Sequence, residues 1–330
     1  THSAEILAGF AELLRIPNVA GDTENILRNA TTIKDALAAR GAEMQLLELP
    51  GASPIVYGTL PAPGATRTLG IYVHYDGQPV NESRWSSGPW EPTLHDRAIE
   101  DGGQPIAFPG PGGSLDPEFR LYARAAGDDK APIPALLAAL DALGAAEIPL
   151  TSNLVFFFEG EEEAGSPNLG EYIRTFAEKL QVDVWLICDG PVHQSRRPQL
   201  VFGVRGVTGM EITVYGASRN LHSGHYGNWA PNPGMMLAQL LASMKDDDGN
   251  VVIDGFYDST DPLSPAAEAA IATVPEVDEM LMRELGLVRT EGDGNLTERL
   301  LVPSLNVKGL SSANVGDKSR NVIPSTATAS

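Results

Sequence analysis

The sequence has 330 residues, of which 42% are hydrophobic and 20% are charged. This composition is that of a globular protein and excludes a disordered chain, and the length suggests about two domains. The formal net charge of −20 repels phosphate backbones and anionic lipid surfaces, so neither nucleic acid nor a membrane is an expected partner.

The chain before residue 206 alternates between predicted helices and predicted strands. Apolar residues with helical spacing, and short continuous apolar runs, predict these elements. In chain order they are helices near residues 6–14 and 24–40, strands at 44–49, 54–60 and 69–75, a Gly- and Pro-rich excursion at 91–119, a helix at 131–143, a strand at 153–158, a helix at 169–180 and a strand at 182–188. Such alternation predicts an α/β domain with a mostly parallel sheet and helices on both faces.

The pattern changes after Gly206. Met210, Ile212 and Val214 alternate with polar residues, which is typical of a strand exposed on one face. The elements predicted after it are a helix at 233–244, an extended segment at 250–256, a helix at 265–285 and extended segments at 301–308 and 321–330. We therefore predict a smaller α+β domain over residues 206–330.

Polar groups stand where the predicted strands of the first domain end. His74 and Asp76 follow one strand, a run of Glu residues at 159–163 follows another, and Asp189 follows a third, while Asp128 precedes a helix. Ligands of open α/β sheets bind at the carboxyl ends of strands, so these groups are expected at one edge. One imidazole and several carboxylates suit Zn²⁺ or Mn²⁺.

Each of these clusters also has a structural explanation. Asp128 suits a helix cap, consecutive Glu residues usually form a solvated face, and Asp189 before Gly190 is a common turn signal. The single cysteine, Cys188, lies in an apolar run and cannot form an intrachain disulfide. Position and residue type alone therefore leave a metalloenzyme beside these structural roles.

Five stretches add a family resemblance. Residues 74–80 (HYDGQPV) resemble the His-Tyr-Asp-x-Gln-Pro-Val motif of carnosinase-type cytosolic nonspecific dipeptidases. These enzymes belong to the family of dinuclear zinc metallopeptidases that includes aminoacylase and succinyl-diaminopimelate desuccinylase. Residues 121–130 (LYARAAGDDK), 158–166 (FEGEEEAGS), 220–227 (NLHSGHYG) and 321–324 (NVIP) resemble the same family in the same order.

The resemblance implies a cofactor of two divalent metal ions, zinc first and manganese as the alternative. His74 would be a ligand of one ion, oriented by the carboxylate of Asp76. Asp128 would bridge both ions, Asp189 would complete the first ligand set, and Glu163 would bind the second ion. The bond between Asp128 and the next residue is expected to be cis.

The resemblance also implies the catalytic groups. Glu162 would be the general base that takes a proton from the attacking water and passes it to the leaving amine. His222 would donate a hydrogen bond to the oxyanion, reaching the active site of a partner subunit. Asn321 would approach the same substrate pocket. A homodimer through residues 206–330 is therefore expected.

The sequence also departs from the family pattern. Glu161 stands where an apolar residue is common. The last metal-ligand histidine and the arginine that grips the substrate carboxylate fall beyond residue 330 in the family pattern. We therefore interpret residues 1–205 as the N-terminal part of a catalytic metal-binding domain. Residues 206–330 are interpreted as an incomplete lid and dimerisation domain, and the chain as a fragment.

The leading hypothesis is metal-dependent hydrolysis of dipeptides or short peptides. One alternative is an amidohydrolase that removes the acyl group from an N-acyl amino acid. Another is an inactive metal-binding or dimerisation module. A nucleotide-binding protein is disfavoured, because no phosphate-cradling Gly-rich loop follows the first strands. Without a membrane-length apolar run or a signal-peptide pattern, we expect a soluble protein, cytoplasmic rather than exported.

Overall fold

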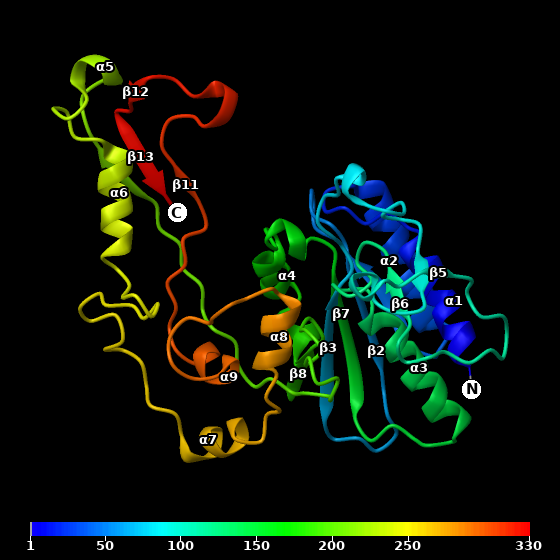
Figure 1. Cartoon of the computed structure of the whole chain (residues 1–330). Helices are drawn as coiled ribbons and strands as arrows, with labels where there is room; N and C mark the ends of the chain where they lie inside the picture. Colours follow the sequence, from blue (N-terminus) through cyan, green and yellow to red (C-terminus); the bar gives the residue numbers. More distant parts are fainter. Residues whose placement is uncertain (1) are drawn as a thin grey trace. The chain divides into compact units, whose positions relative to one another are not determined.

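The computed structural model describes residues 2–330, which form two compact units that divide between Pro191 and Val192 (Figure 1). The boundary proposed from sequence, near residue 206, lies inside the second unit. Each unit has its own sheet and its own hydrophobic core. None of the helices in the described part of the chain is both long and apolar enough to cross a membrane.

The first unit is built on a five-stranded sheet. Its strands, in spatial order, are β1 (Glu43–Leu47), β2 (Ile55–Leu60), β7 (Asn153–Glu159), β3 (Thr68–His74) and β8 (Val184–Ile187). β3 pairs in parallel with both β7 and β8, whereas β2 pairs antiparallel with β1 and β7. All strands but β2 therefore run in one direction, which confirms the predicted mostly parallel sheet.

Helices cover both faces of this sheet. Successive residues of β7 point to opposite faces, and each face packs against different helices. Phe156 and Phe158 pack in a core with α1 (Ser3–Leu14), α2 (Thr23–Ala38) and α3 (Pro132–Ala145). Val155 and Phe157 pack in a second core under α4 (Leu169–Thr175). Each fully buried Phe stabilises the fold by roughly 1.5–3 kcal/mol. Figure 1 shows the first three helices on one side of the sheet and α4 on the other.

The Gly- and Pro-rich excursion carries a small sheet of its own. β5 (Pro105–Ile106), β4 (Thr93–His95) and β6 (Arg120–Tyr122) pair antiparallel in that order. Two short 3₁₀ turns, η1 (Glu82–Arg84) and η2 (Ile99–Asp101), complete the segment.

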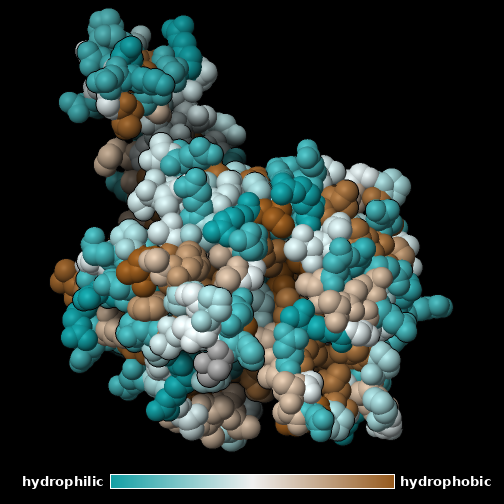
Figure 2. Space-filling view, turned by 90° about the vertical axis from the view of Figure 1, so that its right-hand side faces the viewer, coloured by the Kyte–Doolittle hydropathy of each residue, from teal (hydrophilic) through white to brown (hydrophobic). Residues whose placement is uncertain are grey.

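The surface of the first unit carries both hydrophilic and hydrophobic side chains. Figure 2 views the side that lies to the right in Figure 1 and shows hydrophobic areas among hydrophilic residues. Scattered exposed apolar residues of this kind are normal on a globular protein.

The second unit is α+β, as predicted. β11 (Leu310–Ser311), β13 (Thr326–Ala329) and β9 (Ile212–Tyr215) form an antiparallel sheet in that order. Leu237 of α6 (Pro233–Ala242) is buried against Ala327 and Ala329 of β13. A separate two-stranded ladder joins β10 (Leu221–His222) to β12 (Val322–Ile323).

Three predictions for the second unit were wrong. The helix expected at 265–285 is two helices, α7 (Pro265–Ile271) and α8 (Asp278–Glu284), because Pro275 between them lacks the amide hydrogen that a helix needs. Residues 301–308 form no strand and instead follow the short helix α9 (Leu296–Leu300). Residues 250–256 contribute only an isolated bridge between Val251 and Lys245. Both apolar segments lack the partner strand that a ladder requires.

Candidate metal centre

Three neighbouring strands of the first unit deliver polar groups to one edge of the sheet. His74 is the last residue of β3, Glu159 is the last residue of β7, and Asp189 follows the end of β8 by two residues. The strands are parallel, so their carboxyl ends lie at the same edge. The local sequence therefore places imidazole and carboxylate groups together at the edge where α/β proteins bind ligands.

His74, Asp128 and Asp189 form the candidate metal site. One potential ligand atom from each lies within 4.8 Å of the others. His74 Nε2 is 2.9 Å from Asp128 Oδ1 and 3.9 Å from Asp189 Oδ1. The imidazole is buried, with 1% of its side chain exposed, whereas 73% of the Asp128 side chain is exposed. One nitrogen and carboxylate oxygens suit Zn²⁺ or Mn²⁺, and three protein ligands leave a position for water or substrate.

Asp76 links the imidazole to the neighbouring Glu-rich turn. Its Oδ1 lies 3.4 Å from His74 Nδ1, and the side chain is fully buried. The same carboxylate accepts hydrogen bonds from the backbone amides of Glu162 (3.1 Å) and Glu163 (3.0 Å). A carboxylate at Nδ1 fixes the tautomer and ring orientation of a histidine ligand and leaves Nε2 for the cation.

Glu162 and Glu163 occupy a 3₁₀ turn, η3 (Glu162–Ala164), directly after β7. Glu162 Oε2 lies 4.0 Å from His74 Nε2, which places the carboxylate beside the site. Glu163 Oε2 accepts a hydrogen bond of 2.9 Å from Gln78 Nε2, and the residue is not one of the three grouped ones. The structure thus brings together three of the four predicted metal ligands and leaves Glu163 outside the group.

The concentration of carboxylates shifts the pKa values of the site. Burial lowers the pKa of His74, but the close contact with Asp76 and the charges of Asp129, Asp76 and Asp189 outweigh it and raise the pKa to about 9. Burial raises the pKa of Glu162, with a further contribution from the charge of Asp189, although His74 lowers it. Bringing these acids together therefore favours a positive charge at their centre.

Two residues of the site were not assigned roles from sequence. Asp129 Oδ2 accepts a hydrogen bond from the backbone amide of His74 (3.2 Å), and burial raises the pKa of this carboxyl to about 7. The bond between Asp128 and Asp129 is cis, as the resemblance implied. Gln78 donates to both the side chain and the backbone carbonyl of Glu163. Asp129 and Gln78 both lie inside stretches that carry the family resemblance. Their place next to predicted site residues in the sequence was the only signal that could have pointed to them.

His222 and Asn321 lie in the second unit, next to one another. His222 in β10 pairs with Val322 in β12, and the amide of Ser223 donates to the carbonyl of Asn321 at 3.1 Å. The His222 ring is exposed, and its Nδ1 accepts a hydrogen bond from the Gly224 amide. The ladder between β10 and β12 thus joins the two residues predicted to contact substrate, and their approach to the metal site stays a prediction.

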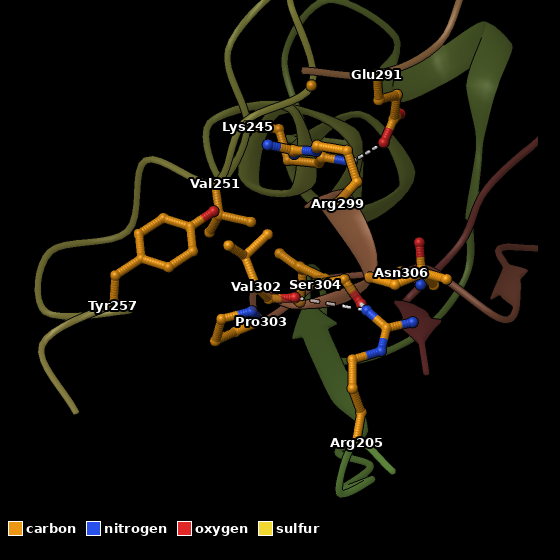
Figure 3. Close-up of a pocket in the computed structure, with 13 residues that line it drawn as sticks. Arg205, Lys245, Val251, Tyr257, Glu291, Arg299, Val302, Pro303, Ser304 and Asn306 are labelled. Atoms are coloured by element: carbon orange, nitrogen blue, oxygen red, sulfur yellow. Dashed lines mark hydrogen bonds and ion pairs between the residues drawn. The ribbon is translucent and has the colours of Figure 1, made fainter. Parts of the chain in front are cut away.

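The second unit also contains a cavity of about 200 Å³ (Figure 3). Arg205 lines it and donates to Ser304 Oγ at 3.2 Å. Figure 3 shows Lys245, Arg299 and Glu291 on the opposite side, with Lys245 paired to Glu291. Among the residues that line this cavity, Glu291 is the only carboxylate, and there is no histidine. A metal hydrolase needs several such ligands, so the centre at His74 is the candidate site.

Comparison with known proteins identifies a family. The model for "Peptidase family M20/M25/M40" matches residues 70–291. The Cys-Gly metallodipeptidase dug1 of Schizosaccharomyces pombe is 26% identical over 338 residues, covering 97% of this chain and 67% of that protein. The human Beta-Ala-His dipeptidase is 28% identical over 256 residues, covering 77% of this chain and 46% of that protein.

A solved structure gives the same picture. The M20 family metallo-carboxypeptidase Sso-CP2 from Sulfolobus solfataricus superposes with a TM-score of 0.74 at 28% identity, covering 98% of this chain and 70% of that one. The chain thus spans about two thirds of the fungal relative and of this structure. Residues 70–291, which the family model matches, include all three residues of the candidate site.

Proposed function

Because the chain belongs to peptidase family M20/M25/M40, we propose that it hydrolyses the peptide bond of dipeptides or short peptides with divalent metal ions held at His74, Asp128 and Asp189. This membership confirms the resemblance inferred from the motifs and makes the protein a metallopeptidase. The observation that carries the proposal is the convergence of one imidazole and two carboxylates within 4.8 Å at the carboxyl edge of the sheet.

Divalent ions bound at this centre would supply a lowered pKa for water and polarisation of the scissile carbonyl. His74 Nε2 and the carboxylates of Asp128 and Asp189 would hold the cation, and Asp76 would keep the imidazole oriented. Zinc is the first candidate and manganese the second, because both accept nitrogen and oxygen ligands. Two ions, with Glu163 as a ligand of the second, remain our proposal.

Glu162 is proposed as the general base. Its carboxylate lies 4.0 Å from His74 Nε2, so it stands beside the cation site without being one of the three grouped ligands. Burial raises its pKa, which brings a carboxylate closer to the pH at which it can both accept and release a proton. It would take the proton of the attacking water and deliver it to the leaving amine.

The second unit would complete the substrate site. We propose that His222 donates a hydrogen bond to the developing oxyanion and that Asn321 contacts the substrate. The family resemblance implies that His222 would reach the active site of a partner subunit, so a homodimer through residues 206–330 belongs to the proposal. The Ser223 amide donates a hydrogen bond to the Asn321 carbonyl. This bond holds Asn321 next to the neighbour of His222 and so supports a shared role for His222 and Asn321.

We propose dipeptides as the substrate class because two of the relatives are a Cys-Gly metallodipeptidase and a Beta-Ala-His dipeptidase. An N-acyl amino acid amidohydrolase and an inactive metal-binding module are the competing functions. The purified protein, supplied with Zn²⁺ or Mn²⁺, should release free amino acids from Cys-Gly or β-Ala-His, and a set of N-acetyl amino acids should remain intact. Cleavage of the N-acetyl set alone would support the amidohydrolase, and no turnover of either set would refute the peptidase assignment.

A further inference from the structure

Glu161 is a buried carboxylate that the proposed reaction does not use. It precedes Glu162 in the turn after β7, and only 6% of the residue's surface is exposed. Its position was noted in the sequence because an apolar residue is common there. Burying a carboxylate is costly unless its oxygens are hydrogen-bonded, so its contacts must compensate for the lost water.

Three hydrogen bonds compensate for this burial. Glu161 Oε1 accepts from the amide of Asn168 at 3.0 Å, and Oε2 accepts from the amide of Ser53 at 3.1 Å and from Asn168 Nδ2 at 3.3 Å. Hydrogen bonds to an ionised acceptor are stronger than neutral ones. The donors come from the turn between β1 and β2 and from the start of α4. The carboxylate therefore fastens two separate segments to the residue beside Glu162.

The backbone of Glu161 closes the same turn. Its carbonyl accepts hydrogen bonds from the amides of Ala164 (3.2 Å) and Ser166 (3.0 Å). On the other side, the Asp76 carboxylate accepts from the amides of Glu162 and Glu163. The turn that presents Glu162 is thus held between two buried carboxylates, Asp76 toward His74 and Glu161 toward the rest of the unit.

We propose that Glu161 is a positioning residue, which fixes the turn carrying Glu162 and Glu163 at the distance from His74 that hydrolysis and metal binding need. It is buried, its oxygens accept three hydrogen bonds, and it is not one of the three grouped residues at His74, so we assign it no role as a ligand or a base. This inference rests on the proposed function for its kinetic consequence. Its structural part concerns metal binding and can be tested without turnover.

Glu161→Gln and Glu161→Met remove the anionic acceptor. Substitution of a residue that orients metal ligands typically lowers activity or metal affinity about 10–100-fold. We expect kcat for the dipeptide to fall by that factor with KM little changed, and Zn²⁺ affinity measured by calorimetry to fall in parallel. Asn168→Ala removes one of the three donors and should give a smaller loss in the same direction if the Glu161 variants do not fold.

Tyr172→Phe is the matched control. Its hydroxyl donates to the Ser53 carbonyl (3.0 Å) and accepts from the Leu49 amide (3.1 Å), so its hydrogen bonds fasten the same β1–β2 turn and not the Glu162 turn. This variant should lower Tm but keep kcat and Zn²⁺ affinity. If Glu161→Gln lowers Tm alone and behaves like the control, the positioning role is refuted. If the wild-type protein binds Zn²⁺ but hydrolyses no dipeptide, the proposed function fails, whereas weaker Zn²⁺ binding in Glu161→Gln still supports the inference.

Discussion

The carboxylate of Asp76 lies 3.4 Å from His74 Nδ1 and also accepts hydrogen bonds from the backbone amides of Glu162 and Glu163. One buried group thereby sets both the orientation of the imidazole and the position of the Glu-rich turn. Asp76→Asn keeps the size but replaces one oxygen with a donor that faces amide hydrogens. We expect metal affinity to fall about 10–100-fold, measured by calorimetry. Asp101→Asn, on an exposed 3₁₀ turn, is the control.

Glu162→Gln tests the proposed base. A neutral amide of the same shape cannot take a proton from water, and loss of general-base catalysis typically costs about 10²–10⁴-fold in rate. We expect kcat to fall by at least this order while bound metal, determined by elemental analysis, stays near the wild-type ratio. Glu178→Gln, at an exposed position, should leave both unchanged. Substantial residual turnover in Glu162→Gln would remove this residue from the mechanism.

Metal affinity should rise with pH. In the protein stripped of metal by a chelator, His74 has a pKa raised to about 9 because its contact with Asp76 and the surrounding acids outweigh burial. A cation must displace that proton, so affinity should increase between pH 7 and about 9 and then level off. Binding of Mn²⁺ can be followed by electron paramagnetic resonance. In Asp76→Asn the rise should shift to lower pH, and a flat profile in the wild type would contradict the assignment of His74 as a ligand.

Lys130 is expected to matter for stability. Its side chain is fully buried, and Nζ donates to the carbonyls of Leu13 and Ile16, both at 3.0 Å, at the end of α1. Lys130→Met fills the space but removes the ammonium donor. The Leu13 carbonyl keeps the hydrogen bond from the Ile16 amide (3.4 Å), whereas the Ile16 carbonyl loses its side-chain donor, at a cost of about 1–3 kcal/mol. Denaturant unfolding should show a lower free energy of unfolding for this variant, and Lys318→Met, on the exposed surface of the second unit, should show no change.

The core of the candidate site was predictable because it depends on local patterns. Apolar runs marked β3, β7 and β8, and their parallel pairing follows from alternation with helices, so His74 and Asp189 were expected at one edge. Asp128 joins them from the loop before α3, where its position before a predicted helix led us to expect it, and the motif resemblance added its role as a ligand. Neither periodicity nor motif resemblance predicted the hydrogen bond from Gln78 to Glu163, because side-chain orientation depends on neighbours distant in sequence.

Predictions failed where a local pattern had no tertiary partner. Residues 301–308 were predicted to be extended, but they form no strand, because a strand exists only where another segment shares its backbone hydrogen bonds. The periodicity across 265–285 was helical on both sides of Pro275, and the interruption came from one residue without an amide hydrogen. The Gly- and Pro-rich excursion shows the reverse case, since its β4 strand is too short for a sequence pattern yet pairs with two partners.

The most direct test of the central claim is a crystal structure of the protein loaded with Zn²⁺, with diffraction recorded on both sides of the zinc absorption edge. The account predicts an anomalous peak about 2.0–2.2 Å from His74 Nε2 and from carboxylate oxygens of Asp128 and Asp189. A fully loaded crystal whose anomalous peaks lie only on other residues, with His74 Nε2 bound to no cation, would contradict it.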